Sequence, residues 1–400
     1  MPGEQFIEDE ITYWGNKQEH AEVTIVPRVV NGEPRRIPTG IKVNLALGNG
    51  RRPVEYLRSL FLTLFSKIFW NELSYIYKDK NLKVGNLIEA FRVTSIVIRL
   101  ERSLRLSFIK DLRIDVAYCY WNDVQAYASV LLKRKGLVKT VVSRAHGFDL
   151  YEDRRSNSYM PLKRQFIHEI DLLLAISSEG KNYLQNIYKA NIKGVCLCRM
   201  GVPIPSTMAL VSGNNELYIL SVSNCVALKR IDRIIKSIHK VALKNPTIKI
   251  NWTHIGDGPL LNELSNLAKN EFNLVNIRYK FLGAMKKSEV MNFIEKNYVD
   301  IFINTSDFEG LPVSIMEAMS YGIPVIAPNI GGISEIVSND CGLLLSKEST
   351  IDDIADAIEY LYSTCKLMLS REMVKKKIID YYNAEHNYRS AIDLIISDLH

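Results

Sequence analysis

The sequence predicts an α/β protein made of two doubly wound parallel-sheet domains, and three observations carry this prediction. Apolar runs of strand length alternate with amphipathic runs of helical length through most of the chain. The alternation restarts after a polar linker near residues 205–215. The length of 400 residues and the hydrophobic fraction of 47% suit two folded domains of ordinary size. Such an alternation requires parallel sheets covered by helices on both faces.

The first half of the chain contains four strand-like runs. A long helical block, roughly residues 53–108, separates the first of them from the second. The runs are VTIVP (23–27), RIDVAYCY (113–120), KTVVSRAHG (139–147) and DLLLAIS (171–177). They predict a βα domain with an inserted helical block over residues 1–205.

The second half alternates more strictly, which predicts a second domain over residues 206–383. Helical sequences such as RIDRIIKSIHKVALKN and PVSIMEAMSYG lie between its strand-like runs. The expected strands are LYILSVS (217–223), IKINWTHIG (248–256), IRYKFLG (277–283), VDIFINTS (299–306) and PVIAP (324–328). In a pair of such domains a ligand is expected at the carboxyl ends of the strands, in the cleft between the domains.

The composition limits the classes of partner and the cellular compartment that we expect for this protein. A net charge of +7 permits attraction to nucleotide phosphates, nucleic acid or an anionic membrane. The six cysteines lack paired zinc spacing, so we expect no metal site and a reducing, cytoplasmic environment. The N-terminal sequence does not resemble a signal peptide, and the most apolar run, residues 59–70, is too short to cross a bilayer and contains Lys67.

Two glutamates mark the most informative stretch, SDFEGLPVSIMEAMSYGIPV. Glu309 and Gly310 follow a buried strand, and Pro312 is expected in the first turn of the next helix. The N–H groups at that helix start would attract a phosphate, and Glu317, further along the helix, would accept hydrogen bonds from a diol. From spacing alone, the alternative is that Glu309 caps the helix and Glu317 is solvated.

The residue identities in this stretch are more informative than the spacing of its two glutamates. EGLPVSIMEAMSYGIPVIAPNIGGISEIV resembles the signature of the family-4 retaining glycosyltransferases. The segments SVSNCVALKRID, IGDGPLLNEL, FLGAMKKSEV and SRAHGFDLYED resemble other parts of the same family, so the resemblance covers nearly the whole chain. It implies a GT-B fold, in which two Rossmann-like domains face each other across a cleft.

The resemblance implies a donor site in the second domain. Glu309 would contact the donor sugar, Glu317 the ribose hydroxyls, and Lys229 would neutralise the diphosphate. The remaining donor-binding residues would be backbone groups in two turns and polar side chains beside Lys229, namely Gly310, Leu311, Pro312, Val313, Gly256, Gly258, Asn224 and Arg230.

The resemblance places the acceptor in the first domain. His146 would act on the transferred sugar and the reacting centre, while Arg144, Gly147 and Asp149 would lie on the acceptor side. The last helix, residues 384–400, would pack back on the first domain.

Two positions depart from the family pattern. Family members commonly carry an arginine five residues before the lysine, where this chain has Asn224, and Arg230 is the candidate substitute. The family also begins with a buried strand before the segment that reads GEQFIEDEI here. This first strand is missing from the sequence, with Gly3 as the remainder of its loop, so we expect either a start codon set too late or a gapped N-terminal sheet.

The resemblance implies a retaining hexosyltransferase of bacterial surface polysaccharide assembly, such as capsule, exopolysaccharide or lipopolysaccharide O-antigen. Its donor would be a nucleoside diphosphate sugar, its acceptor a hydroxyl of a glycan or lipid-linked oligosaccharide, and it would need no metal or other cofactor. The alternative is a non-catalytic nucleotide-sugar-binding protein or a truncated, inactive glycosyltransferase. No strand leads into GxGxxG, which disfavours a dinucleotide-dependent oxidoreductase. No nucleic-acid-binding module is recognisable, and the oligomeric state is not predicted.

A basic amphipathic segment suggests a further partner. Residues 92–113 interleave arginines with apolar residues, and together with Arg51, Arg52 and the aromatic-rich run to Tyr77 they predict a peripheral contact with an anionic membrane, on the inner face of the plasma membrane. The alternative is an ordinary domain helix with a solvated basic face.

Overall fold

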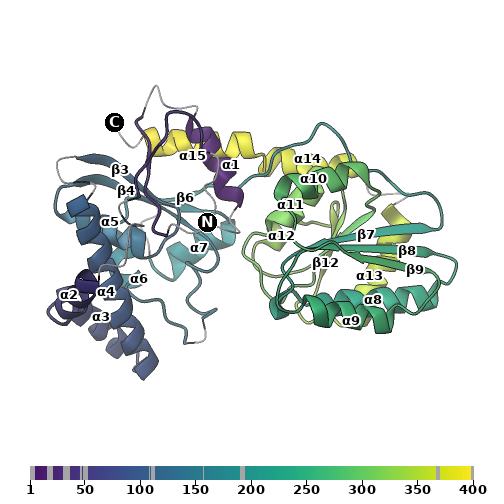
Figure 1. Ribbon diagram of the computed structural model, residues 1–400, viewed down its shortest axis with the longest axis horizontal. Helices are drawn as coiled ribbons and strands as arrows, with labels where there is room; N and C mark the ends of the chain where they lie inside the picture. The colour runs from purple at the N-terminus through teal and green to yellow at the C-terminus, as the bar shows by residue number, and fades with distance from the viewer. Residues whose placement is uncertain are drawn as a thin grey trace. The chain divides into compact units, whose positions relative to one another are not determined.

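The computed structural model describes residues 5–15, 21–29, 37–45, 47, 53–107, 109, 113–155, 157–189, 194–365 and 370–397. The chain divides into two compact units. Unit 1 comprises Met1–Arg199 and Tyr388–His400, and unit 2 comprises Met200–Asn387. Each unit is a parallel α/β assembly with its own core, which confirms the predicted fold class (Figure 1). The predicted boundary, after residue 205, falls within unit 2.

Unit 1 holds two separate parallel sheets among its described residues. One has four strands in the order β3-β4-β5-β6, and the other pairs β1 with β2. The strands are β1 Thr24–Ile25, β2 Lys42–Val43, β3 Ile114–Cys119, β4 Val138–Ala145, β5 Leu172–Ala175 and β6 Val195–Leu197. The helices are α1 Gln5–Gly15, α2 Pro53–Leu64, α3 Lys67–Lys78, α4 Val84–Ser107, α5 Val124–Arg134, α6 Lys163–Phe166 and α7 Ser178–Asn186.

The sequence predicted either a start codon set too late or a gapped N-terminal sheet, and the two sheets formed by the described strands of unit 1 do not test this prediction. The first described element is α1, so Gly3 and any strand before it lie outside the described residues. The long helical block is resolved into α2, α3 and α4, because Ser66 caps α3 and a short turn separates α3 from α4.

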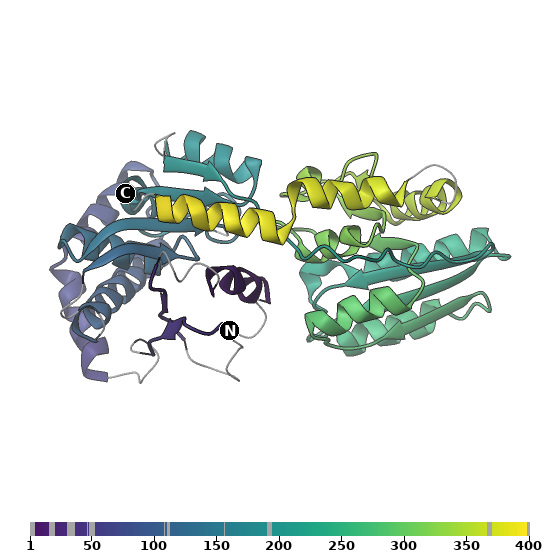
Figure 2. The ribbon, with the colours of Figure 1, turned by 90° about the horizontal axis from the view of Figure 1, so that it is seen from above.

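The core of unit 1 lies between the four-stranded sheet and the helices that cover it. Val93, Val97 and Leu100 of α4 pack into this core with residues of α5 and β4. On the sheet's other face, Ile395 of α15 (Ala384–Ser397) clusters with Val142 and Leu172. Figure 2 shows this C-terminal helix, in yellow, running along the strands.

Unit 2 contains one six-stranded parallel sheet in the order β12-β11-β10-β7-β8-β9. Its strands are β7 Glu216–Val222, β8 Lys249–Ile255, β9 Ile277–Phe281, β10 Ile301–Ile303, β11 Val325–Pro328 and β12 Gly342–Leu345. Its helices are α8 Ile231–Lys244, α9 Leu261–Glu271, α10 Lys287–Lys296, α11 Val313–Ser320, α12 Ile333–Ile336, α13 Ile351–Cys365 and α14 Arg371–Tyr381. The elements β12, α13 and α14 were not among those predicted.

The strand order of unit 2 reverses direction between β7 and β10. The chain steps outward from β7 to β8 and β9, and then returns to the other side of β7 to form β10, β11 and β12. Helices α8, α9 and α13 cover one face of the sheet, and α10, α11 and α14 cover the other (Figure 1). At such a reversal the connections leave the carboxyl ends of neighbouring strands toward opposite faces, which opens a crevice suited to a ligand.

Candidate functional site

The candidate site lies where the strand order of unit 2 reverses. Lys229 ends a short helical turn, Ala227–Lys229, in the connection that follows β7, and Glu309 follows β10. The ammonium nitrogen Nζ of Lys229 lies 2.6 Å from Oε1 of Glu309. Because β7 and β10 are neighbouring parallel strands, their carboxyl ends place these two side chains together.

Further donors fix the Glu309 carboxylate. Asn304 Nδ2 and Ser306 Oγ donate to the same oxygen, Oε1, at 3.1 and 2.7 Å. The residue is 9% exposed. Among the described residues all three hydrogen bonds reach Oε1, so Oε2 keeps its capacity to accept from a ligand.

The two connections that carry Lys229 and Glu309 are bonded to each other. Thr305 Oγ1 donates to the carbonyl oxygen of Arg230 at 2.8 Å, and the backbone N–H of Asp307 donates to that of Leu228 at 2.9 Å. These bonds join the backbones that carry both charged side chains, independently of the ion pair. The roles of Asn304, Thr305 and Ser306 were not predicted, although their polarity directly after a buried strand was a usable signal.

The turn after Glu309 leads into α11. Pro312 is the residue before the helix and not in its first turn as expected, because its ψ of 109° is extended. The first N–H groups of an α-helix have no partners within the helix, so the start of α11 at Val313 is a position that can bind an anion. Gly310 and Leu311 form the turn itself, and the N–H of Gly332 donates to the Gly310 carbonyl oxygen at 2.8 Å.

Gly331 supports this turn and was not predicted as a site residue. Its φ is +51°, and an added Cβ would lie 2.0 Å from the carbonyl oxygen of Glu309. Only glycine avoids both the strained backbone and this overlap. Gly331 therefore allows the backbone after β11 to approach the turn that carries Glu309.

Glu317 projects from α11 and is largely buried, with 13% of its side chain exposed. Its Oε1 lies 3.5 Å from Nζ of Lys287, at the start of α10. Lys287 was not predicted as a site residue. Glu317 is thus largely buried, which contradicts the alternative that it lies on a solvated helix face.

The predicted glycine turn follows β8. Gly256 and Gly258 have φ of +152° and +154°, and a Cβ on either would overlap backbone atoms of Ser223 or Cys225. The N–H of Cys225 donates to the Asp257 carbonyl oxygen at 2.9 Å. Glycine is needed here because the connections after β7 and β8 pack backbone to backbone.

Arg230 and Asn224 flank Lys229 without sharing its environment. Arg230 has a left-handed backbone, with φ of +48°, and its guanidinium pairs with Asp232 at 3.2 Å and Asp307 at 3.3 Å. Two carboxylates therefore already compensate its charge. Asn224 is exposed and uncharged, in place of the arginine expected at its position.

The acceptor-side residues lie in unit 1. His146 follows β4, is 5% exposed, and its ring lies 5.1 Å from that of Tyr120 and 4.2 Å from that of Trp121. Its backbone N–H donates to Asp149 Oδ1 at 2.6 Å. Burial would raise the pKa of Asp149, but hydrogen bonding and charge from His146, with Lys163 nearby, outweigh burial and lower this pKa. Gly147 is half-buried.

Two unpredicted residues complete this part of unit 1. The N–H of Asn122 donates to Asp149 Oδ2 at 2.7 Å, and Nζ of the fully buried Lys163 donates to the carbonyl oxygens of Asn122 and Asp149. Burial lowers the pKa of Lys163 to about 8. Asp149 therefore orders the loop that carries His146.

Arg144 lies in the interior of unit 1. Its side chain has no exposed surface, its Nη2 lies 3.2 Å from Glu10 Oε2, and its Nε donates to the Tyr118 hydroxyl at 3.0 Å. A side chain in this position cannot line a solvent-open acceptor pocket. Arg144 instead ties α1 to the four-stranded sheet, which corrects the expectation for this residue.

Part of this chain matches a known protein family. Residues 209–377 match the family described as Glycosyl transferases group 1. These residues form a group 1 glycosyltransferase domain. It includes Lys229, Glu309 and Glu317 together with the strand reversal at which the first two meet.

Two curated relatives are similar to parts of this chain. A putative colanic acid biosynthesis glycosyltransferase, WcaL of Escherichia coli K12, is 27% identical over 236 residues, which cover 57% of this chain and 56% of the relative. An Escherichia coli UDP-Gal:alpha-D-GlcNAc-diphosphoundecaprenol alpha-1,3-galactosyltransferase is 29% identical over 142 residues, covering 36% of this chain and 35% of the relative. The chain thus matches about half or less of the length of these curated relatives.

A solved glycosyltransferase from Rickettsia africae extends the likeness to both units. Its TM-score is 0.66 at 16% sequence identity, with 99% of this chain and 94% of that chain covered. At this identity the likeness establishes the fold, which is GT-B.

Proposed function

We propose that this protein is a retaining glycosyltransferase that moves a hexose from a nucleoside diphosphate sugar to a hydroxyl of a glycan or lipid-linked oligosaccharide in bacterial surface polysaccharide assembly. The observation that carries the proposal is the meeting of Lys229 and Glu309 at the strand reversal of the group 1 domain. The names of the colanic acid and undecaprenol-linked relatives support the acceptor class.

Each part of the donor would contact a different group of this site. The diphosphate would take the positive charge of Lys229 and the N–H groups at the start of α11. The sugar hydroxyls would donate to Glu309, whose Oε2 accepts no hydrogen bond from the described residues. Glu317, beside Lys287, would accept from the ribose diol. The glycine turn at Gly256 and Gly258 would lie beside the base.

The transfer step would depend on stabilisation of the negative charge on the leaving diphosphate. The bond between the anomeric carbon and the β-phosphate oxygen breaks, and the acceptor oxygen bonds to that carbon on the same face. The acceptor's proton passes to the departing diphosphate. A nucleoside diphosphate leaves readily once its charge is held, so the protein needs to supply Lys229 and backbone N–H groups more than a strong base.

A ligand screen tests the donor site. A donor that binds only the folded protein raises the melting temperature of the protein. Among UDP-, GDP-, ADP- and dTDP-hexoses, the preferred donor should therefore give the largest rise. The rise should vanish in Lys229→Ala and persist in Lys244→Ala, which removes an exposed lysine at the far end of α8. Proton NMR of the product would then report the anomeric configuration. Inversion would contradict the retaining mechanism.

Substitution of His146 distinguishes an enzyme from a non-catalytic binding protein. We propose that its ring, held by Tyr120 and Trp121, acts in the transfer step. In His146→Ala, transfer should fall strongly while the melting-temperature rise with donor stays. If the unaltered protein binds donor and transfers no sugar to any lipid-linked or soluble glycan, the non-catalytic alternative holds.

We also propose that unit 1 contacts an anionic membrane on the cytoplasmic side. The contact would use α2 and α3, which lie in the predicted aromatic-rich run to Tyr77, and not the predicted segment 92–113. None of the helices among the described residues is long and apolar enough to span a bilayer. The apolar side of α4 packs in the core, and Arg102 and Arg105 pair with Glu55 and Glu101. Arg51 and Arg52 lie outside the described residues.

Helix α2 has the reverse of the usual amphipathic arrangement. Its buried positions are the small polar residues Ser59 and Thr63, and Ser59 Oγ lies 2.9 Å from Ser95 Oγ of α4. Its exposed side is apolar, with exposures between 49% and 73% for Val54, Leu57, Phe61, Leu64 and the following Phe65. Small residues inward and large apolar residues outward are typical of helices that face lipid.

Exposed cations beside this apolar side favour anionic lipid as the occupant. Arg58, Lys67 and Lys78 are exposed on α2 and α3, and Trp70 and Tyr77 add aromatic side chains that suit a membrane interface. Flotation with vesicles of phosphatidylglycerol and phosphatidylcholine should carry the protein, less so at 0.5 M than at about 0.1 M salt. Leu57→Glu with Phe61→Glu should abolish flotation, and Val275→Glu, at a fully exposed position of unit 2, should not. Equal flotation of both variants would overturn this membrane contact.

A further inference from the structure

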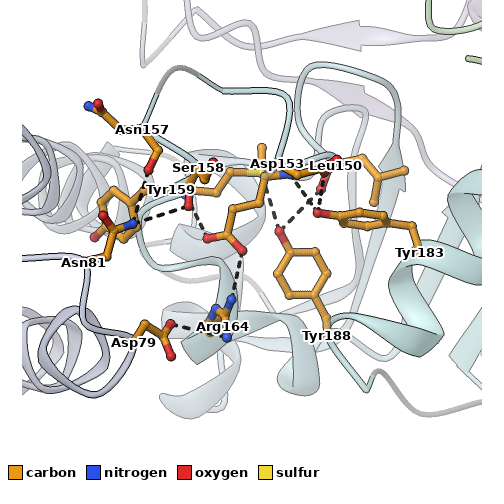
Figure 3. A network of polar contacts seen from close by, with 12 residues as sticks. Asp79, Asn81, Leu150, Asp153, Asn157, Ser158, Tyr159, Arg164, Tyr183 and Tyr188 are labelled. Atoms are coloured by element: carbon orange, nitrogen blue, oxygen red, sulfur yellow. Dashed lines mark hydrogen bonds and ion pairs between the residues drawn. The ribbon is translucent and has the colours of Figure 1, made fainter. Parts of the chain in front are cut away.

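Unit 1 contains a polar cavity that the proposed donor site does not use. It has a volume of about 470 Å³ and lies among α3, the turn from α3 to α4, and the segment 152–164. The volume falls in the range of small-molecule sites. Asn81 Nδ2 joins the two walls by donating to the carbonyl oxygens of Asn157 and Ser158 at 3.2 and 3.5 Å (Figure 3).

Two buried carboxylates form part of the cavity lining. Glu72 is 2% exposed and Glu152 is 6% exposed. Tyr159 donates from its hydroxyl to Glu72 Oε1 at 2.7 Å, and the N–H of Leu162 donates to the same oxygen at 2.9 Å. Gln165 Nε2 donates to Glu72 Oε2 at 2.6 Å. These bonds fix the orientation of the Glu72 carboxylate before any ligand enters.

Glu152 retains more hydrogen-bonding capacity than Glu72. Its Oε1 accepts from the N–H of Met160 at 3.1 Å, and its Oε2 accepts from Arg164 Nη2 at 3.2 Å. A carboxylate oxygen can accept two hydrogen bonds, and each oxygen of Glu152 accepts one from the described residues. A ligand that brings hydroxyl donors would meet this remaining capacity.

The charges around the cavity favour a neutral ligand. The lining carboxylates are Glu72, Asp79 and Glu152, and the lining cations are Lys80, Lys83 and Arg164. Arg164 pairs with Asp79 at 3.3 Å (Figure 3). It also pairs with Glu152. The numbers of the two signs are equal, so neither a phosphate nor a free cation is preferred. Lys80 and Lys83 are exposed, whereas two of the carboxylates are buried.

Aromatic side chains complete the lining. Tyr75 is 38% exposed on α3, and Tyr159 is half-buried in the opposite wall. Fixed carboxylate acceptors, amide groups and aromatic rings around a cavity of this size match a polyhydroxylated ring, which presents O–H donors at its edge and C–H groups on its face.

We propose that this cavity binds a sugar unit of the glycan acceptor. The inference rests on the proposed function for the identity of its ligand, and on the cavity itself for the chemistry of recognition. The pair Tyr75 and Tyr77 supplies a matched test, because both lie on α3 but only Tyr75 lines the cavity, and Tyr77 is 70% exposed on the opposite side of the helix.

Saturation-transfer NMR in lipid-free buffer tests binding directly. The probes are the methyl glycosides of glucose, galactose, mannose, rhamnose and N-acetylglucosamine, offered to the full chain. At least one should bind, and its dissociation constant should rise about tenfold in Tyr75→Ala and in Glu152→Gln but stay unchanged in Tyr77→Ala. Circular dichroism would confirm that each variant is folded. Failure of all five glycosides to bind, or equal binding by Tyr75→Ala and Tyr77→Ala, would overturn the proposal.

The proposed cavity site and the proposed function can fail independently of each other. Glycoside binding that depends on Tyr75, in a protein that transfers no sugar, keeps the cavity site and rejects the proposed function. The matching transfer assay uses a soluble glycan acceptor in lipid-free buffer, where a membrane contact of Tyr77 has no effect. Transfer with the same acceptor KM in Tyr75→Ala and Tyr77→Ala rejects the cavity site and keeps the proposed function. When both hold, Tyr75→Ala should raise the acceptor KM with little change in kcat or in the donor KM.

Discussion

The ammonium group of Lys229 and the carboxylate of Glu309 form an ion pair of 2.6 Å at the point where the sheet of unit 2 reverses its strand order. The two residues come from connections that follow neighbouring strands. The pair places a cation and a hydrogen-bond acceptor at the start of α11, where a nucleoside diphosphate sugar would need both.

Removing the cation should weaken nucleotide binding. We expect Lys229→Ala to raise the dissociation constant of the preferred nucleoside diphosphate by about tenfold or more, because a charge-assisted contact to the diphosphate is lost. Isothermal titration calorimetry measures this directly. Lys244→Ala serves as the control, and equal affinity in the two variants would show that Lys229 does not contact the diphosphate.

Gly331→Ala should distort the turn that carries Glu309. The added methyl would lie 2.0 Å from a backbone oxygen at a φ of +51°, so we expect about 1–3 kcal/mol of destabilisation and a clear loss of donor binding. Gly283→Ala separates the two effects, because Gly283 has a φ of +70° and nothing within 4 Å of its added Cβ. Urea denaturation compares the variants. A similar loss of stability in both would mean that backbone strain, and not overlap with the Glu309 turn, is responsible.

The buried pair of Arg144 and Glu10 predicts a strong effect on stability. In Arg144→Met the Glu10 carboxylate would be left in the interior without its cation, so we expect a loss of about 3–5 kcal/mol in the free energy of unfolding. Adding Glu10→Gln should restore a large part of this loss. Arg134→Ala, which breaks an exposed pair with Glu169, should cost about 1 kcal/mol or less. No recovery in the double variant would contradict the assignment of the effect to an unpaired charge.

His254 should make unit 2 sensitive to acid. Burial lowers the pKa of His254 to about 4 from an ordinary value of 6.5. The folded state therefore holds the ring neutral while the unfolded state takes up a proton below pH 6.5. The stability from His254 is fully present above pH 6.5 and is lost as the pH falls toward 4, a change of about 3 kcal/mol.

Denaturation curves between pH 7 and pH 4 would check this window. His254→Gln cannot titrate, so its stability should fall less steeply with acid than that of the unaltered protein. The hydroxyl of Ser221 lies 2.9 Å from His254 Nδ1, and a glutamine amide offers a partner to the same hydroxyl. Parallel pH dependence in the two proteins would show that His254 is not the group responsible.

Most elements of unit 2 were predictable from the sequence because their signals are local. Residues 248–256 were expected as a strand and form β8, Lys249–Ile255, and the expected helix from Arg230 to Asn245 forms α8, Ile231–Lys244. The expected strand 23–27 contains β1, Thr24–Ile25. Periodicity fails at β2, because a strand of two residues carries no pattern.

The candidate site was only partly accessible to the same reasoning. Glu309, Glu317 and Lys229 were named through a resemblance, and their proposed roles stay predictions. Lys287 and Gly331 were missed because each acts through a contact with a residue distant in the sequence or through backbone geometry. Asn304 contacts the nearby Glu309, and its polarity directly after a buried strand was a signal that was not used. Arg144 was placed on the acceptor side, since sequence spacing does not reveal that its partner is Glu10 in α1.

By itself the sequence determined the alternation of strands and helices, the presence of two units and the motif of the group 1 domain, because apolar periodicity and motif spacing are properties of neighbouring residues. Tertiary structure alone decided which charges meet and which helix faces are covered. It paired Lys229 with Glu309 across 80 residues, buried Ser59 and Thr63 of α2 while exposing Phe61, and enclosed Glu72 and Glu152 around one cavity. The physical reason is that burial and ion pairing depend on strand order and helix packing, which bring together residues with no local relationship in the chain.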